Sequence, residues 1–98
     1  YYAAAEYTEA IKLFREILTA RTRVLGASHP DTLRSLGSLA NNYRAAGQHR
    51  QAARLHKKAL ASRQRTLGAD HPSTRASQRN LAASLRASRE TENDPPSP

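Results

Sequence analysis

The chain has 98 residues and no cysteine, and its sixteen Lys and Arg outnumber its eight Asp and Glu to give a net charge of +8. This length allows one ordinary domain, and the lack of cysteine excludes a disulfide framework and a thiolate metal site. No apolar run approaches the roughly 20 residues that a membrane-spanning helix needs. No signal peptide is visible, so we expect a cytoplasmic protein. Because the chain does not begin with Met, we expect a processed product or a fragment.

The first two predicted elements are helices over residues 6–25 and 30–46. In the first, apolar residues recur at helical spacing: Tyr7, Ala10, Ile11, Phe14, Ile17, Leu18, Val24 and Leu25. Gly26 follows its end, and Pro30 suits the first turn of the next helix, where its missing N–H is no loss. The second helix carries Leu33, Leu36, Leu39, Ala40 and Tyr43 and ends before Gly47.

The other two predicted helices cover residues 48–67 and 72–89. Gly68 and Pro72 mark the end of one and the start of the other, as Gly26 and Pro30 do for the first pair. The third helix carries Ala52, Leu55, Ala59, Leu60 and Leu67, and the fourth carries Leu81, Ala82 and Leu85. The final segment, ETENDPPSP over residues 90–98, has three prolines and no other apolar residue. We expect this polar tail to be disordered.

The sequence repeats itself at a distance of 42 residues. The phrase RVLGASHPDT at 23–32 returns as RTLGADHPST at 65–74, and residues 10–45 match residues 52–87 at sixteen of thirty-six positions. A fixed period of this size indicates stacked supersecondary units. The sequence therefore predicts an all-α protein built of antiparallel helix hairpins, with one hinge used twice.

The second hairpin resembles the tetratricopeptide repeat. It reads Leu36-x2-Leu39-Ala40-x2-Tyr43 and then Ala52-x3-His56, close to the W-x2-L-G-x2-Y and A-x3-F signature. The 42-residue period and the LG-x-x-HP-x-T linker are similar to the kinesin-light-chain type. The resemblance spans about residues 1–89 and implies a short right-handed α-solenoid. His56 and Gln78 depart from the pattern, since the apolar Phe14 and Leu36 stand at the equivalent repeat positions.

The resemblance also implies a binding surface, because the first helix of each tetratricopeptide pair lines a concave groove. The residues expected to bind a peptide there are Arg34, Asn41, Arg44, Arg79 and Arg86. Arginine is a bidentate donor for carboxylates, and an asparagine amide can bind a peptide backbone as both donor and acceptor. An acidic or carboxylate-ended peptide is the expected ligand. Arg54 and Lys57 are expected on the outward face of the longer second helix.

Other functions are less well supported by the sequence. The histidines do not have the i, i+4 spacing of a helical zinc site, no phosphate-binding loop or catalytic trio is evident, and we expect neither a cofactor, a metal, nor an enzyme. Two alternatives to peptide binding stay open. One is a structural segment of a larger regulator that self-associates or stacks on other repeats of its parent chain. The other, less favoured, is non-specific nucleic-acid binding by the basic surface, and no membrane partner is expected.

Overall fold

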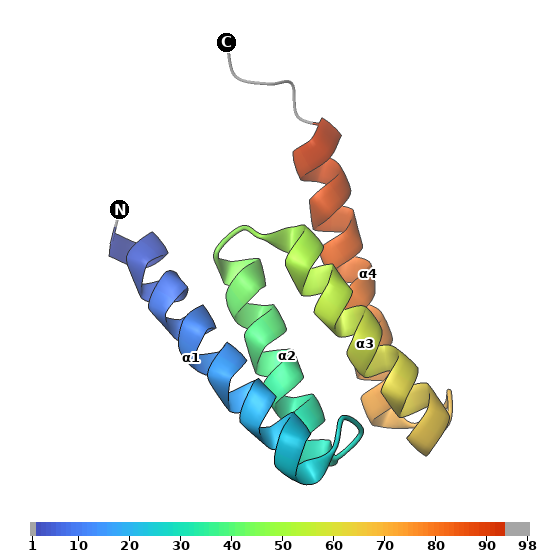
Figure 1. The fold of residues 1–98 in the computed structure, drawn as a ribbon. Coiled ribbons are helices and arrows are strands. Elements are labelled where there is room, and N and C mark those ends of the chain that lie inside the picture. The colour runs from blue at the N-terminus through green and yellow to red at the C-terminus, as the bar shows by residue number, and fades with distance from the viewer. Residues whose placement is uncertain (1, 94–98) are drawn as a thin grey trace.

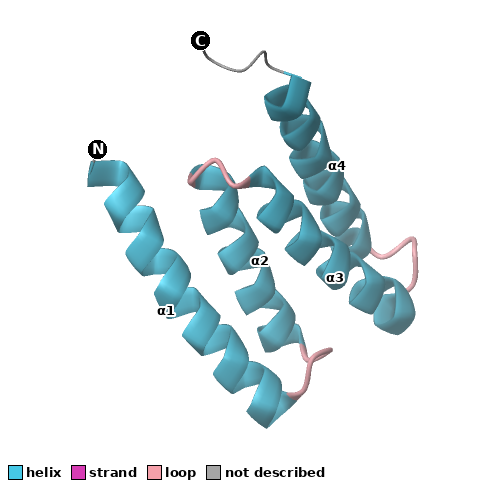
Figure 2. Ribbon diagram, turned by 45° about the horizontal axis from the view of Figure 1, so that its top comes forward, coloured by secondary structure: helices cyan, strands magenta, loops and turns pink. Residues whose placement is uncertain are grey.

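The computed structural model describes the backbone of residues 2–93 and the side chains of residues 6–90. Within that part the fold is all-α, as predicted, with four helices: α1 (Tyr2–Leu25), α2 (Pro30–Ala45), α3 (His49–Leu67) and α4 (Pro72–Asn93). The helices alternate in direction, and the main packing joins consecutive helices (Figure 1). Only short loops connect them (Figure 2).

Both outer helices are longer than predicted. α1 begins at Tyr2 rather than at residue 6, and α4 continues to Asn93 rather than ending at Arg89. The disordered tail predicted from residue 90 is therefore wrong for residues 90–93, because Glu90, Thr91 and Glu92 continue the helix before the prolines begin. The rest of the predicted tail, residues 94–98, lies outside the described residues.

The α1–α2 and α3–α4 hinges begin with the same backbone conformation. Gly26 has φ +94° and Gly68 has φ +90°, a region that glycine enters at no steric cost. Each glycine amide still donates back into its helix, from Gly26 N to Thr22 O at 3.0 Å and from Gly68 N to Gln64 O at 3.2 Å. The repeated glycine thus ends each helix by turning the chain away from the helical path.

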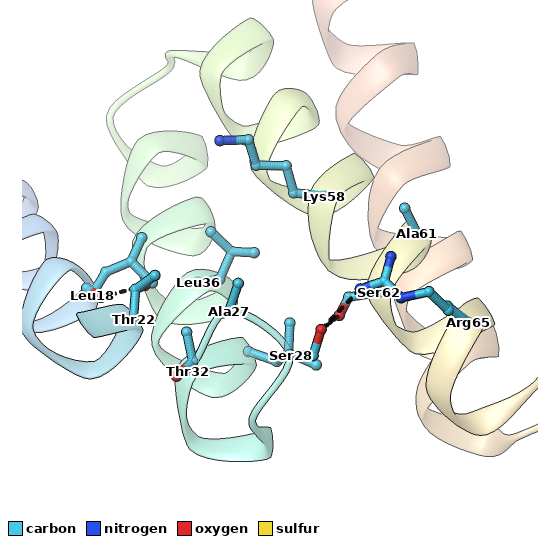
Figure 3. A pocket seen from close by; sticks show the side chains of 11 residues that line it. Leu18, Thr22, Ala27, Ser28, Thr32, Leu36, Lys58, Ala61, Ser62 and Arg65 are labelled. Atoms are coloured by element: carbon cyan, nitrogen blue, oxygen red, sulfur yellow. Dashed lines mark hydrogen bonds between the residues drawn. The ribbon is translucent and has the colours of Figure 1, made fainter. Parts of the chain in front are cut away.

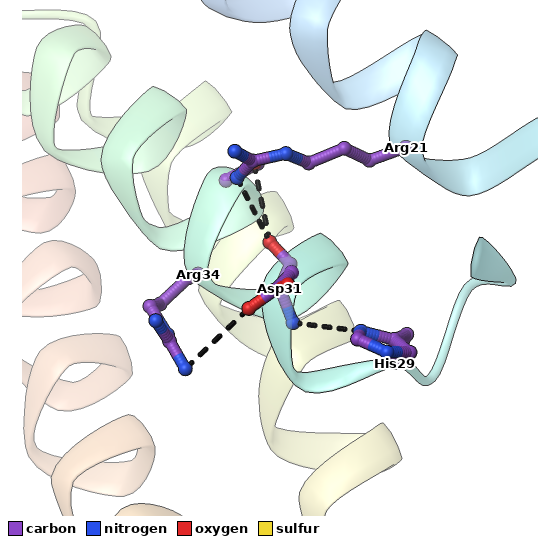
Figure 4. Close-up of polar contacts among 5 residues, drawn as sticks. Arg21, His29, Asp31 and Arg34 are labelled. Atoms are coloured by element: carbon purple, nitrogen blue, oxygen red, sulfur yellow. Dashed lines mark hydrogen bonds and ion pairs between the residues drawn. The ribbon is translucent and has the colours of Figure 1, made fainter. Parts of the chain in front are cut away.

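A histidine side chain caps the helix after each hinge. Asp31 N donates to Nδ1 of His29 at 3.0 Å (Figure 4), and Ser73 N donates to Nδ1 of His71 at 3.1 Å. Ser, Thr, Asp or Asn usually fill this position, and here the imidazole satisfies the same otherwise unpaired amide. The bond requires an unprotonated Nδ1, so the two histidines serve as turn-fixing residues.

An arginine and a serine join the two helices of each hinge. Nη1 of Arg21 donates to Oγ of Ser35 at 2.6 Å, and Nη1 of Arg63 donates to Oγ of Ser77 at the same distance. Ser35 and Ser77 are only 3% and 1% exposed. Because the donor is charged and the acceptor is buried, these are among the stronger kinds of hydrogen bond. The 42-residue period therefore repeats individual bonds as well as helices.

The α2–α3 turn has a different geometry. Gly47 has φ +83°, its amide donates to Arg44 O at 3.0 Å, and the amide of Gln48 donates to Tyr43 O at 2.8 Å. This pair of bonds is the Schellman arrangement, which satisfies the last carbonyls of α2. α3 then starts directly, so α2 and α3 form a tight antiparallel pair.

The apolar core is centred on α2. Leu33, Leu36 and Ala59 form its buried cluster, and the partly buried Leu18 and Leu55 pack against it from α1 and α3. The molecule measures 47 × 29 × 16 Å, and its thinnest dimension is less than two helix diameters of about 10 Å. The core is consequently thin, and it draws on three helices.

The predicted apolar residues of α4 are not its most deeply buried ones. Leu85 is 46% exposed, Ala82 is exposed and Leu81 is half-buried. The buried positions of α4 are Thr74, Ser77, Ser84 and Ser88. The cause is the neighbourhood of the helix: α2 packs between α1 and α3, whereas α4 packs mainly on α3 and leaves its other side open. Leu81 lies in the same helical stripe as these buried positions and Leu85 lies at its edge, so the periodic apolar residues are covered only partly by α3.

Candidate peptide-binding surface

Three of the predicted site residues share the exposed face of α2. Arg34, Asn41 and Arg44 are all exposed, and spacings of seven and three residues bring them to one side of a helix. The opposite side of α2 is the buried one that carries Leu36 and Leu39. The helix is amphipathic, so burying the leucines forces this polar row outward.

The other two predicted site residues form a similar row on α4. Arg79 and Arg86 are exposed and lie seven residues apart, two turns along the helix. Half-buried alanines accompany them at Ala76, Ala83 and Ala87. A short alanine side chain beside each arginine leaves room for a backbone to approach this side of the helix.

The two rows belong to helices that are not directly packed as a pair. α3 lies between α2 and α4 in both views (Figures 1 and 2), and the substantial packing runs from α2 to α3 and from α3 to α4. The structure brings Arg34, Asn41 and Arg44 together, and it brings Arg79 and Arg86 together. A single concave face shared by all five remains a prediction.

The polar groups of the α2 row are only lightly engaged within the chain. Nη2 of Arg34 lies 3.5 Å from Oδ1 of Asp31, but the arginine side chain is 76% exposed, and pairs of this kind are weak. Nδ2 of Asn42 donates to Ser38 O at 2.9 Å, whereas the amide of Asn41 has no hydrogen bond among the described residues. Asn41 is thus the asparagine whose amide remains open to a ligand.

Arg44 also affects the interior through its charge. Burial lowers the pKa of His56 below its ordinary value of 6.5, and the nearby charges of Arg44 and Arg63 lower that pKa further. Nε2 of His56 is buried without a hydrogen-bond partner. His56 is therefore a packing residue held in its neutral form, and its neighbour Arg44 belongs to both the exposed row and the electrostatics of the core.

Sequence reasoning missed a second basic surface at the junction of α3 and α4. A cavity of about 370 Å³ is lined by Arg50, Ala53, Arg54, Lys57, Leu81, Leu85 and Ser88. Arg54 and Lys57, expected to face outward, are exposed but contribute to this cavity. The open apolar residues Leu81 and Leu85 were the available signal, since they stand where Leu39 and Tyr43 stand one repeat earlier.

Metal-ligand clusters and membrane-spanning helices are both absent from the described part of the chain. No cluster of three or more His, Asp or Glu side chains there could hold a metal ion. None of the helices in the same region is long and apolar enough to cross a bilayer. The features that stand out are helix faces and a repeated hinge, and these define a helical-repeat scaffold.

The chain belongs to the tetratricopeptide-repeat family, whose model matches residues 1–65. It is similar to a crystal structure from Podosopora anserina described as kinesin light chain with nearly identical TPR-like repeats, at 32% identity and a TM-score of 0.79. A point variant of that protein matches at 32% identity and a TM-score of 0.80. Each match covers 90% of this chain but only 42% of the other. No curated protein matches the sequence.

These matches confirm the kinesin-light-chain-like repeat type and the α-solenoid predicted from the 42-residue period. Tetratricopeptide repeats generally mediate protein–protein interaction, and their fold is typically a non-catalytic interaction module. The chain spans less than half the length of the solved structures that it matches. The helix faces are where an interaction of this kind should be sought.

Proposed function

We propose that this chain binds an acidic or carboxylate-ended peptide through the exposed faces of α2 and α4. The observation that carries the proposal is the arrangement of Arg34, Asn41 and Arg44 on one exposed face of α2, with a second pair of exposed arginines on α4. Arginine binds carboxylates in two-pronged geometry, and the Asn41 amide can donate to and accept from an extended backbone.

The surrounding charge supports an acidic ligand. The net charge is +8, and residues 72–89 of α4 contain no Asp or Glu. A field of this sign favours acidic partners and accelerates their encounter. Ala83 stands where Asn41 stands one repeat earlier, so the α4 row would supply charge and space, while backbone recognition would come from α2.

The test compares three double charge reversals in binding to a fluorescent acidic peptide. Arg44→Glu with Arg86→Glu changes the proposed surface, Arg54→Glu with Lys57→Glu changes the α3–α4 cavity, and Lys12→Glu with Arg15→Glu changes α1. We expect the first variant to lose at least about tenfold more affinity than the third, a difference of about 1.4 kcal/mol. Equal losses in all three would mean diffuse electrostatic attraction, and a largest loss in the second would move the site to the α3–α4 cavity.

Salt and Asn41 separate the two components of the proposed surface. Added salt should weaken binding, because exposed charges are screened beyond about 8–10 Å at physiological ionic strength. Asn41→Ala should reduce affinity while leaving the salt dependence nearly unchanged, since it removes backbone contacts and no charge. A single-stranded oligonucleotide measured in parallel tests the nucleic-acid alternative, which tighter binding than to the peptide would favour.

A structural role in self-association is the second candidate. Leu13 on α1 is 55% exposed and Leu85 on α4 is 46% exposed, at positions whose repeat equivalents, Leu55 and Tyr43, are half-buried. Exposed apolar residues of this kind are suited to stacking on another helix. Sedimentation over a range of concentrations tests this role, and a monomer at every concentration would contradict it.

A further inference from the structure

A cavity lies on the other side of α2 from the Arg34–Asn41 row, between α1, the α1–α2 loop, α2 and α3. Its volume is about 410 Å³, which is within the range of about 300–1,000 Å³ typical of small-molecule sites. Figure 3 shows Lys58 and Arg65 on the α3 side of the cavity and Leu18 and Leu36 on the other side. Its lining residues are Leu18, Thr22, Ala27, Ser28, Thr32, Leu33, Leu36, Lys58, Ala61, Ser62 and Arg65.

The lining divides into an apolar part and a cationic part. Leu18, Leu33 and Leu36 come from α1 and α2, while Lys58 and Arg65 come from α3, two turns apart along one helix. None of the lining residues is acidic. A ligand that matches this division has a hydrocarbon body and one negative charge.

The hydrogen bonds on the cationic side leave the proton of the Ser28 hydroxyl free to be donated to a ligand. Nη2 of Arg65 donates to Oγ of Ser28 at 2.9 Å, and the hydroxyl of Ser62, a residue 8% exposed, donates to the same oxygen at 3.0 Å. Ser28 Oγ therefore receives two hydrogen bonds, one of them from a cation. Its own proton is then available to an acceptor, and a hydroxyl polarised in this way is a stronger donor.

We propose that this cavity binds an apolar monocarboxylate, such as a medium-chain fatty acid. The carboxylate accepts from the Ser28 hydroxyl and is neutralised by Arg65, and the hydrocarbon lies against Leu18, Leu33 and Leu36. The site is separate from the proposed peptide surface, and it includes the α1–α2 hinge loop through Ala27 and Ser28.

The second hinge differs from the first at three of the decisive positions. Forty-two residues on, Ser28 becomes Asp70, Leu33 becomes Arg75 and Leu36 becomes Gln78. Asp70 pairs with Arg75, with Oδ1 and Nη2 3.7 Å apart. A carboxylate ligand would meet a carboxylate there, and only Leu60, the equivalent of Leu18, would remain of the three apolar residues. The proposed site is thus confined to the first hinge, although both hinges share their backbone geometry.

The repeat supplies its own test variant. Ser28→Asp introduces the residue that the second hinge already carries, so the fold should tolerate it while ligand binding is lost. Octanoate is the probe, titrated into the full chain and followed by calorimetry and by amide chemical shifts of Ser28, Ser62 and Arg65. Octanol has the same hydrocarbon without the charge, and octylammonium has the opposite charge.

The expected result is binding of octanoate in preference to both analogues, with a loss of at least about tenfold in Ser28→Asp and in Arg65→Gln. Affinity should rise by about fourfold for each methylene added between six and eight carbons. Arg54→Gln with Lys57→Gln, which removes two charges from the α3–α4 cavity, should leave binding unchanged, and thermal melts establish that every variant is folded.

Two outcomes would overturn the proposal. Equal binding of octanoate and octanol, or unaltered binding in a folded Ser28→Asp variant, would remove the anion-binding role. Binding of a short peptide with a free C-terminal leucine, with none of octanoate, would make the cavity a peptide site instead. Because Arg44 and Arg86 are outside this cavity, failure here leaves the proposed peptide surface untouched, and the converse also holds.

Discussion

The first hinge region consists of α1 and α2, and the second consists of α3 and α4. The two regions have the same turn between their helices, but the residues packed between the helices differ. Both have a left-handed glycine, a histidine cap and a 2.6 Å arginine–serine bond. Their packing residues differ, because Phe14 corresponds to His56 and Leu36 to Gln78. A few polar residues therefore specify the turn, while the residues packed between the two helices can change from apolar to polar without altering it.

The largest effect should come from the glycine that the two hinges share. Gly68→Val should destabilise the protein by about 2–3 kcal/mol, because φ +90° is strained for a residue with a Cβ. A Cβ at Gly68 would meet no atom within 4 Å, so the cost is one of backbone strain. Thermal and urea melts measure it.

Gly37→Ala is the matched control for the hinge glycine. Gly37 lies inside α2 and also has open space around a Cβ, but its φ is not positive. Replacing a mid-helix glycine by alanine should stabilise by roughly 0.5–1 kcal/mol. A hinge variant as stable as the wild type would show that the glycine does not determine the turn.

The next largest effect concerns the arginine–serine bond. Arg63→Ala should cost about 1–2 kcal/mol, because it leaves the buried Ser77 hydroxyl without its 2.6 Å partner. Arg63 is half-buried and Arg21 is exposed, so Arg21→Ala should cost less. Double-mutant cycles with Ser77→Ala and Ser35→Ala isolate the two bonds. A larger loss at Arg21 would reverse the expected ranking of the hinges.

The smallest effect is the pH dependence that His56 contributes in the second region. Because burial and nearby arginines lower the pKa of His56, its native state binds fewer protons than the unfolded chain. Its contribution to stability is therefore complete above about pH 6.5 and is lost as the pH falls through the native-state pKa.

His56→Phe installs the residue found at the equivalent position of α1 and should reduce this acid sensitivity. Melts of both proteins between pH 5 and 8 give the comparison, in which the other histidines contribute equally to both. Parallel stability curves for the two proteins would contradict the role given to His56.

The sequence predicted what depends on local geometry and missed what depends on neighbours. The LG-x-x-HP-x-T phrase indicated where helices end and restart, because Gly and Pro act on their own backbone. The buried hydroxyl face of α4 could not be read in this way. Thr74, Ser77 and Ser84 are buried because α3 covers them, whereas the periodic Leu81 and Leu85 beside them are more exposed and line the α3–α4 cavity.

The same distinction between local geometry and neighbouring helices applies to the candidate site. Arg34, Asn41 and Arg44 are exposed on one side of α2, which their spacing alone decides, and their role in binding stays a prediction. The α3–α4 cavity joins two helices, and the cavity beside Ser28 joins three helices and a loop. The residues that line each cavity depend on how neighbouring helices pack, and the apolar pattern of a single helix does not carry that information.

The repeated joint has a consequence for how such a molecule can grow. A hinge whose hydrogen bonds recur after 42 residues acts as a fixed screw operation, carrying each helix onto the next equivalent one by the same rotation and translation. Length can then be added by copying residues 30–71 as a block, since the copy would begin and end on the same joint. The exposed residues of a block can then be substituted while the path of the superhelix stays the same.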